Sequence, residues 1–402
     1  MTRLKEYREG LTSFVSADVQ HYTEKEGQPT ADMPVFYNPK MCINRDISVI
    51  FLSEYLSRWD IDLLCEPLAG SGVRTLRYLN ECQGSHRAVM FDVNPEAVHI
   101  IQQNIEENHL SERATVIQGD ARLLLLSESR EKRFDFVDVD PFGTPVPYLN
   151  AAVQALNPTG ALLSLTATDM PALCGVYPPV AFRKYGGFSI RSPISHEIAI
   201  RLLLGVSYSV TGANDRSMSP LAVLSTDHYV RVWLRVESSR KTSNRQAKEI
   251  GWLRHCPRCM NTDLVSLREG LEDEFNHCRD DCQYDPKAAG PLWIGSLCDA
   301  EFVQEAYKKV SEYKLHKKSS RLIQLMSQEA PLTEAPYIDI HAICDSYRLT
   351  PPSNAELIAV LTEQGLETTR THFRPTALRT EASPCEVVRA IHKIKGVAIQ
   401  NG

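Results

Sequence analysis

Short apolar segments alternate with helical patterns over residues 46–237, and several of the apolar segments end in a polar residue. Strands are predicted over residues 62–66, 88–92, 114–119, 134–140 and 161–168, with a closing hairpin over 221–225 and 228–237. Helices are predicted over 46–59, with Asp46 as the cap, over 94–108, and from Asp120 onward. Because alternating strands and helices form a mostly parallel sheet covered on both faces, we predict a Rossmann-like α/β domain.

The length of 402 residues exceeds that of one ordinary domain. We divide the chain into an N-terminal segment of residues 1–45, which looks irregular, the α/β domain of residues 46–237, and a smaller domain of residues 238–402 that opens with a polar, basic linker over 238–248. No apolar run reaches the roughly 20 residues that span a bilayer, and the N-terminus lacks the pattern of a signal peptide. We therefore expect a soluble, cytoplasmic protein that contacts no membrane. We also expect it to be a monomer.

A glycine turn, Leu68-Ala-Gly-Ser-Gly72, follows the first predicted strand, and Arg74 comes soon after it. Open α/β sheets bind ligands beyond the carboxyl ends of their strands, where glycine lets the backbone approach a ligand closely. Asp92 ends the second predicted strand, where a carboxylate can accept hydrogen bonds from ribose hydroxyls. Asp120 ends the third, where a carboxylate can receive an adenine amino group. Together these residues predict a nucleoside-binding pocket.

Nicotinamide dehydrogenases also use a glycine turn followed by an acid, but their fingerprint is G-x-G-x-x-G. The turn here reads A-G-S-G-V-R, without the third glycine in register. This favours an S-adenosylmethionine pocket over a nicotinamide pocket. Two alternatives stay open at this point: a dehydrogenase with a zinc-binding lobe, and a non-catalytic RNA-binding protein built on a methyltransferase fold.

The fourth predicted strand ends in Asp138-Val-Asp140-Pro141-Phe142, at the place where amino-methyltransferases carry Asp/Asn-Pro-Pro-aromatic. The exocyclic amine of guanine is a poor nucleophile, because its lone pair is delocalised into the ring. Asp140 and a carbonyl of the Asp140-Pro141 turn can accept its N–H groups and free that lone pair, while Pro141 fixes the turn. Phe142 can stack on the base. Asp138 would point the same way as Asp140 and take up the proton or order the turn.

A base inside a paired stem must leave the stack to reach such a pocket, so we expect base flipping and a surface that binds RNA. The net charge of −6 means that this surface must be a local patch. Three groups of basic residues are candidates: Arg231, Arg235, Arg240, Lys241, Arg245, Lys248, Arg254 and Arg258; Lys308, Lys309, Lys314, Lys317, Lys318 and Arg321; and Arg370, Arg374 and Arg379.

Eleven cysteines in a chain expected in the cytoplasm favour thiols or metal ligands over disulfides. The pair Cys256 and Cys259 is followed after 18 residues by the wider pair Cys278 and Cys282, and four thiolates in this pattern fit tetrahedral zinc. Nearby residues that could replace one ligand are His255, His277 and Cys298. Because the cluster lies outside the strand ends, we predict a structural zinc ion.

Five motifs extend the pattern over nearly the whole chain. They are Val35-Phe-Tyr-Asn-Pro39 with Asn44-Arg-Asp46; Asp138-Val-Asp-Pro-Phe-Gly-Thr-Pro145; Thr166-Ala-Thr-Asp169 with Leu173-Cys-Gly175; Gly290-Pro-Leu-Trp293; and Pro351-Pro352 with Arg370-Thr-His-Phe373. Together they resemble the motifs of the tRNA (guanine-N2)-dimethyltransferases that modify guanosine 26.

The resemblance implies a class I methyltransferase domain and a smaller α+β C-terminal domain, with a zinc-binding segment over 256–298, that helps to hold tRNA. It implies a base pocket at Asp140, Pro141 and Phe142, with zinc at the cysteine pairs. It implies S-adenosyl-L-methionine contacts at Phe36, Arg45, Arg74, Asp92, Asp120 and Ala121, so that residues 1–45 contribute to the cofactor pocket. The expected products are N2-methyl- and N2,N2-dimethylguanosine in tRNA.

Overall fold

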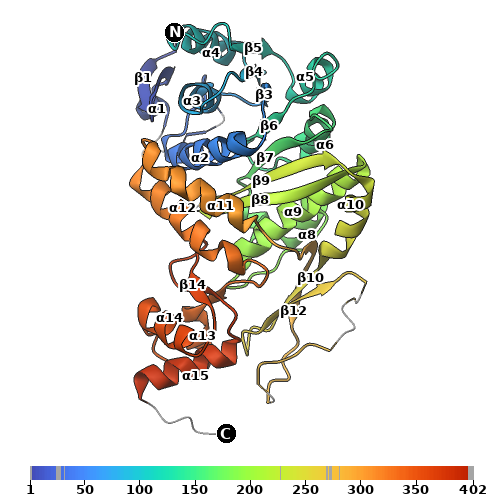
Figure 1. Ribbon diagram of the computed structural model, residues 1–402, viewed down its shortest axis with the longest axis vertical. Coiled ribbons are helices and arrows are strands. Elements are labelled where there is room, and N and C mark those ends of the chain that lie inside the picture. Colours follow the sequence, from blue (N-terminus) through green and yellow to red (C-terminus); the bar gives the residue numbers. More distant parts are fainter. Residues whose placement is uncertain are drawn as a thin grey trace.

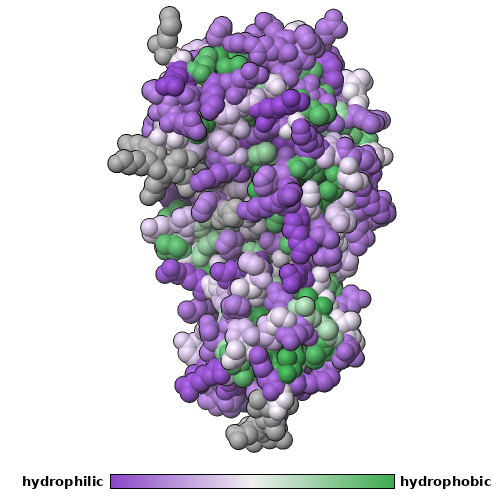
Figure 2. Space-filling model, turned by 90° about the vertical axis from the view of Figure 1, so that its left-hand side faces the viewer, coloured by the Kyte–Doolittle hydropathy of each residue, from purple (hydrophilic) through white to green (hydrophobic). Residues whose placement is uncertain are grey.

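The computed structural model describes residues 2–23, 29–30, 32–226, 228–268, 270, 274–279 and 281–396, so the last predicted domain ends outside the described residues. The molecule is elongated, with the main sheet in its upper half and the C-terminal helices at its lower end (Figure 1). Over the face in Figure 2, hydrophilic side chains predominate and hydrophobic ones form small separate groups. In the described part of the chain, no helix has both the length and the apolar character needed to cross a bilayer.

Within the described residues, seven strands form one sheet in the order β5-β4-β3-β6-β7-β9-β8. Their bounds are β3 Leu63–Glu66, β4 Arg87–Asp92, β5 Ala114–Gln118, β6 Phe136–Val139, β7 Ala161–Ala167, β8 Arg216–Thr226 and β9 Tyr229–Ser238. The strands from β3 to β7 pair in parallel, whereas β9 is antiparallel to both of its neighbours. The strand order reverses at β3, so the carboxyl ends of β3, β4 and β6 meet at one edge. The predicted Rossmann-like fold is confirmed.

The central strands β6 and β7 consist of buried residues along their whole length. Burial along the whole length is typical of parallel strands that are covered on both faces. The helices of this part are α2 Cys42–Arg58, α3 Val73–Glu81, α4 Pro95–Glu107, α5 Ala121–Glu128, α6 Val146–Ala155, α7 Met170–Leu173, α8 Pro178–Tyr185 and α9 Ser195–Ala213. Asn94 and Asp120 cap α4 and α5 by accepting backbone N–H groups, so both predicted helix starts are confirmed.

The N-terminal segment is ordered into an antiparallel hairpin, although the sequence looked irregular there. β1 (Leu4–Glu9) pairs with β2 (Thr12–Ala17), and the short helix α1 (Val19–Tyr22) follows. The prediction of Asp46 as a helix cap is wrong, because α2 begins one turn earlier. Asp46 is instead buried inside α2, where it accepts hydrogen bonds from Arg77 Nη1 at 2.8 Å and from Ser319 Oγ at 2.7 Å. It thereby joins α2 to α3 and to α12 (Lys317–Glu329).

The predicted linker is a helix, α10 (Arg240–Gln246), which packs on β8. Farther along, α11 (Ala300–Lys308) and α12 lie against α2 (Figure 1), and Phe302 shares a hydrophobic core with Phe51 and Trp233. A separate core lies among the C-terminal elements β13 Ile338–Asp339, α13 Ile340–Tyr347, α14 Asn354–Glu363, β14 Thr368–Arg370, β15 Ala377–Thr380 and α15 Pro384–Lys395. The division of the chain at residues 45 and 237 stays a prediction.

The C-terminal part is attached to the main sheet through the buried carboxylate of Glu329, at the end of α12. This carboxylate accepts the backbone N–H of His372 at 2.9 Å and pairs with Arg379 Nε at 3.2 Å. The side chain of His372 reaches the main sheet, because its Nε2 accepts the backbone N–H of Ser225 on β8 at 3.2 Å. Burial alone would raise the pKa of Glu329, but His372 and Arg379 outweigh burial and lower it to about 2.

Replacing Glu329 with glutamine is expected to flatten the acid limb of the stability curve. The folded pKa of about 2 lies below the ordinary value of 4.5, so the ionised carboxylate stabilises the fold above pH 4.5 and this stabilisation is lost as the pH falls toward 2. Urea unfolding across this window should show a steeper loss of stability for the parent than for Glu329→Gln. Equal slopes for the two proteins would contradict this role.

Candidate active site and metal site

The backbone of the turn after β3 lies very close to another segment of the chain. Gly70 and Gly72 have φ values of +57° and +75°, which only glycine adopts without strain. A Cβ added to Gly70 would lie 2.9 Å from the carbonyl oxygen of Phe36. Phe36 therefore lies directly over the glycine turn, which places the segment before α2 at the predicted pocket.

Asp92 and Asp120 lie at the ends of adjacent strands, as predicted. Asp92 accepts the backbone N–H of Gly70 at 2.8 Å and that of Asn94 at 2.9 Å, so its carboxylate joins the ends of β3 and β4. Burial raises the pKa of Asp92, and these backbone donors oppose the rise. Asp120 caps α5 and pairs with Arg122 at 2.9 Å, while Ala121 next to it is buried. The strand ends thus present two carboxylates beside a glycine turn.

Arg45 is buried, and the N-terminal hairpin holds it in place. Its Nε donates to Glu9 Oε2 at 2.7 Å and its Nη2 donates to the carbonyl of Asn38 at 2.9 Å. Its guanidinium also lies over the ring of Tyr37, at 5.3 Å from the centroid. Glu9 could not be predicted as a partner of Arg45, because it lies in a polar stretch that shows no strand pattern.

Arg74 is the centre of a buried charge cluster that connects the cofactor turn to the end of β6. Its Nη2 pairs with Asp140 Oδ2, and its Nη1 lies 3.8 Å from Asp138 Oδ2. Glu66, at the end of β3, lies 3.7 Å from Arg74 Nε and accepts the Thr75 hydroxyl at 2.6 Å. Burial raises the pKa of Glu66 to about 8, so Glu66 is largely neutral at pH 7. The cluster then balances two arginines, Arg74 and Arg231, against two aspartates.

Asp138 is fully enclosed and has strong partners on both oxygens. Arg231 on β9 donates to its Oδ1 at 2.8 Å and to its Oδ2 at 2.7 Å, and the Tyr78 hydroxyl donates to Oδ2 at 2.6 Å. A carboxylate enclosed in this way fits the second of its two predicted roles, ordering the turn, better than it fits taking up the proton. Its nearness to Arg74 agrees with the prediction that it points the same way as Asp140.

Asp140 lies at the sheet edge with 19% of its side chain exposed. Burial acts to raise the pKa of Asp140, but Arg74, Arg231 and a hydrogen bond from Thr166 outweigh it, and the net pKa is lowered. The carboxyl group is therefore an ionised acceptor at neutral pH. The turn that follows is fixed to the end of β7, since Gly143 N donates to Thr168 Oγ1 and Thr168 N donates to the Gly143 carbonyl, both at 2.8 Å.

Pro141 is buried, whereas Phe142 has 57% of its surface exposed although it is a large apolar residue. Its ring meets that of Phe36 edge to face, with the centroids 4.4 Å apart and the planes at 75°. Because Phe36 also covers the glycine turn, the two rings link the predicted cofactor and base pockets. An exposed aromatic face beside an ionised carboxylate is suited to hold a planar base that carries an amino group.

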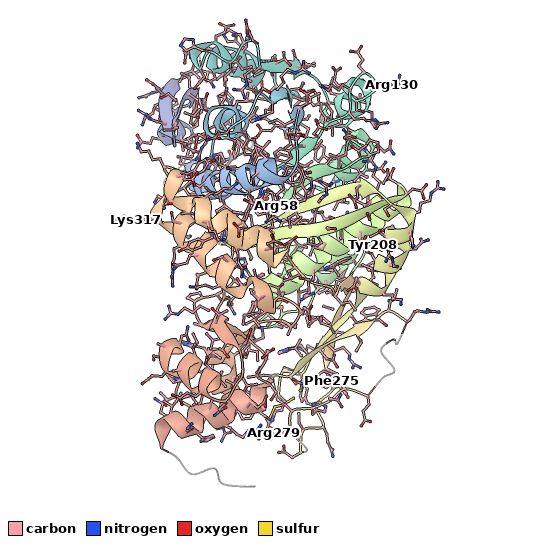
Figure 3. All side chains as sticks on the ribbon, in the orientation of Figure 1. Arg58, Arg130, Tyr208, Phe275, Arg279 and Lys317 are labelled. Carbon is pink, nitrogen blue, oxygen red and sulfur yellow. A yellow bond between two sulfur atoms is a disulfide. The ribbon has the colours of Figure 1, made fainter. Side chains whose placement is uncertain are left out.

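The predicted basic groups are only partly available for binding phosphate. Three of their members are buried in ion pairs: Arg231 with Asp138, Arg254 with Asp263, and Arg379 with Glu197 and Glu329. Exposed members are Arg240, Lys241, Arg245, Lys248, Arg258, Lys308, Lys314, Lys317, Lys318, Arg321 and Arg370. Lys317, labelled in Figure 3, lies at the outer end of α12.

The cysteine-rich segment and three strands form a small lobe, which we call the cysteine lobe. The strands are β10 (Ile250–His255), β11 (Thr262–Ser266) and β12 (Lys287–Trp293). Cys256, Cys259, His277 and Cys282 bring four ligand atoms within 4.8 Å of one another. The sulfur atoms of Cys256 and Cys282 are 3.7 Å apart, and Cys259 Sγ is 3.5 Å from His277 Nδ1. Zinc bonds of about 2.3 Å to sulfur and 2.0 Å to nitrogen at tetrahedral angles give separations of about 3.8 and 3.5 Å, so this ligand set fits zinc.

The predicted ligand Cys278 is not part of this group. The structure joins Cys278 to Cys385 in a disulfide, whereas the sequence favoured thiols or metal ligands over disulfides. His277, one of the named substitutes, takes the fourth position instead. Phe275 and Arg279, labelled in Figure 3 in the lower part of the molecule, lie on either side of His277 and Cys278 in the sequence, and Arg279 lies over the ring of Tyr347 at 5.4 Å.

The sequence of the chain is similar to known proteins over almost its full length. Residues 16–392 match the family described as N2,N2-dimethylguanosine tRNA methyltransferase. The chain is 34% identical over 371 residues to the tRNA (guanine(26)-N(2))-dimethyltransferase of Methanosphaera stadtmanae, covering 91% of this chain and 93% of the relative. It is 32% identical over 394 residues to the enzyme of the same name from Methanobrevibacter smithii, covering 97% of each.

A solved structure also superposes on nearly the whole chain. The structure of Trm1 from Pyrococcus horikoshii in complex with S-adenosyl-L-methionine matches with a TM-score of 0.82 and 27% sequence identity. The match covers 96% of this chain and 99% of that chain. The similarity therefore extends across the main sheet, the cysteine lobe and the C-terminal helices.

Proposed function

Because the chain belongs to the N2,N2-dimethylguanosine tRNA methyltransferase family, we propose that it methylates the exocyclic amine of guanosine 26 in tRNA. The methyl donor is S-adenosyl-L-methionine, and the products are N2-methyl- and N2,N2-dimethylguanosine. The observation that supports this best is the Asp140-Pro141-Phe142 turn, which Arg74 joins directly to the glycine turn of the cofactor pocket. We further propose that the enzyme is a cytoplasmic monomer.

The residues at the strand ends carry the chemical groups needed to bind S-adenosyl-L-methionine. The Asp92 carboxylate at the end of β4 is suited to the ribose hydroxyls, and Asp120 with Ala121 at the start of α5 is suited to the adenine. Phe36 covers the glycine turn, Arg74 follows that turn in the sequence, and Arg45 donates to the carbonyl of Asn38, two residues after Phe36. When bound, S-adenosyl-L-methionine supplies a methyl group on a sulfonium, which makes that group electrophilic.

Asp140 activates the guanine amine by accepting one of its N–H groups. This hydrogen bond draws the nitrogen toward tetrahedral geometry and directs its lone pair away from the ring. After transfer, the positively charged nitrogen is far more acidic than a carboxylic acid, so Asp140 can accept the proton despite its lowered pKa. Asp138 holds Arg74 and Arg231 in place and so fixes the position of Asp140.

Phe142 and Phe36 provide the apolar surface for the flipped guanine. The target base must leave its stack to reach a turn at the sheet edge. Stacking on an aromatic ring recovers about 1–3 kcal/mol per base. Most of the rate gain then comes from holding the amine in line with the methyl group.

The proposal is tested by incubating the protein with labelled S-adenosyl-L-methionine and unmodified tRNA, followed by mass spectrometry of the nucleosides. We expect label in N2-methyl- and N2,N2-dimethylguanosine, and none when adenosine replaces the guanosine at position 26. Label in another nucleoside would overturn the assignment. Cofactor binding without any transfer would favour the non-catalytic RNA-binding alternative.

For the cysteine lobe we propose a structural zinc ion held by Cys256, Cys259, His277 and Cys282. Cys259→Ser is expected to remove the metal and lower the melting temperature, because the hydrophobic cluster around the ligands consists only of cysteines and Phe275. Mass spectrometry of the native protein measures the metal content, and a thermal melt measures stability. Cys278→Ser is the control that should keep its metal, since Cys278 lies in the disulfide. Metal loss in Cys278→Ser but not in Cys259→Ser would refute this ligand set.

A further inference from the structure

The segment between β7 and α9 lies directly beside the catalytic turn. Asp169, two residues after the end of β7, accepts a hydrogen bond from Lys184 Nζ at 2.9 Å and another from the Tyr185 hydroxyl. Thr168, the residue before Asp169, exchanges two hydrogen bonds with Gly143 in the turn that follows Asp140. The helix α8, which carries Lys184 and Tyr185, is thus attached to the same strand end that supports the catalytic turn.

This segment is also held firmly on its other side. The backbone of Phe188 exchanges hydrogen bonds with Gly290, with Phe188 N donating at 2.7 Å and Gly290 N donating at 2.8 Å. Gly187 packs tightly against Pro291, the residue after Gly290, because a Cβ on Gly187 would lie 2.2 Å from the carbonyl oxygen of Pro291. The backbone that carries Phe188 is therefore fixed to the cysteine lobe.

Two phenylalanines on this fixed backbone are stacked on each other at the surface. The rings of Phe182 and Phe188 are 4.4 Å apart between centroids and 12° from parallel. Phe182 is 46% exposed and Phe188 is 42% exposed, and Val176 and Tyr177 nearby in sequence are also exposed. Contiguous exposed apolar side chains, such as this ring pair, are typical of binding surfaces, whereas single scattered ones are not.

The charge of the segment indicates the kind of partner. Residues 170–196 contain no aspartate or glutamate, but they contain Arg183, Lys184 and Arg191, in a chain whose net charge is −6. Arg183 and Arg191 are exposed. Aromatic rings combined with a local excess of positive charge are typical of surfaces that bind unpaired nucleotides.

We propose that Phe182 and Phe188, with Arg183 and Arg191, form a stacking surface for unpaired tRNA nucleotides next to the flipped guanosine. This inference rests on the proposed function. Flipping one base removes a stacking partner from its neighbours, and an aromatic surface beside the catalytic turn replaces that partner. The two arginines neutralise the phosphates of the same nucleotides.

The test measures tRNA binding and methylation by Phe182→Leu and Phe188→Leu, which keep the apolar volume but remove the flat ring. The dissociation constant for unmodified tRNA should rise about fivefold to a hundredfold, and KM should rise more than kcat falls. Phe182→Tyr should bind like the parent, because it keeps the ring. Leu11→Ala, at an exposed apolar site on the hairpin turn, is the control and should also bind like the parent.

Two further measurements separate stacking from charge. A 2-aminopurine beside the target guanosine should be quenched when the parent binds the tRNA and should stay bright with Phe188→Leu. Arg183→Gln and Arg191→Gln should each lower the slope of log affinity against log salt by about 1. A parent that transfers no methyl group to tRNA would refute the proposed function. An active parent whose leucine variants bind and quench like the parent would refute the stacking surface alone.

Discussion

Replacing Asp140 with alanine is expected to lower methyl transfer to tRNA by about a thousandfold or more, because positioned proton acceptors contribute roughly 10²–10⁴ in rate. The variant loses the acceptor that directs the amine lone pair. It also loses the group that receives the proton after transfer. Single-turnover measurement of labelled methyl transfer at saturating cofactor and tRNA isolates this chemical step from binding.

Cofactor binding should be largely unchanged in Asp140→Ala. The variant leaves Arg74 buried, but Arg74 still lies 3.8 Å from Asp138 and 3.7 Å from Glu66. Glu66, whose pKa is about 8, can lose its proton and compensate the charge. Asp120→Ala is the matched contrast, since it should weaken cofactor binding with a smaller loss of kcat. Near-normal turnover in Asp140→Ala would remove the assigned mechanism.

Replacing Arg231 with methionine is expected to destabilise the fold by about 3–5 kcal/mol, the usual cost of breaking a buried ion pair by removing one partner. Arg231 and Asp138 are both fully buried, and the guanidinium contacts both carboxylate oxygens. Without Arg231, Asp138 keeps the Tyr78 hydroxyl and the more distant Arg74. Urea unfolding at neutral pH measures the change in the free energy of unfolding.

Arg235→Met on the same strand is the control for this prediction. Arg235 contacts Tyr55 and the partly exposed Glu237, and its guanidinium lies over the ring of Trp59. Partly exposed pairs contribute little, so its replacement should cost about 1 kcal/mol or less. A loss below 1 kcal/mol for Arg231→Met, or equal losses for the two variants, would contradict the central part given to the Arg231–Asp138 pair.

The parallel strands of the main sheet could be predicted because they are short, buried and mostly apolar runs that are followed by polar residues. The N-terminal hairpin could not, since β1 is mostly exposed and reads Leu-Lys-Glu-Tyr-Arg-Glu without an apolar stripe. Helix α10 was missed for a similar reason, because Ser243 is the one buried residue among its seven. In both cases tertiary packing, and not local pattern, decides the structure.

The strand-end acids could be predicted, because a parallel sheet brings the carboxyl ends of its strands to one edge. The partner of Asp138 could not, since Arg231 is 93 residues away and reaches it only through the pairing of β7 with β9. The fourth zinc ligand could not be predicted either, because its identity depends on a residue that is distant in the sequence. Cys385, 107 residues beyond Cys278, takes that sulfur, and the adjacent His277 joins the cluster.

The most direct measurement is a structure of the chain bound to S-adenosylhomocysteine and unmodified tRNA. The account predicts that the target guanosine is turned out of its stack, with its ring against Phe142 and its amine nitrogen about 3 Å from the Asp140 carboxylate. A target guanosine still stacked in the tRNA, or bound with its amine away from Asp140, would contradict it.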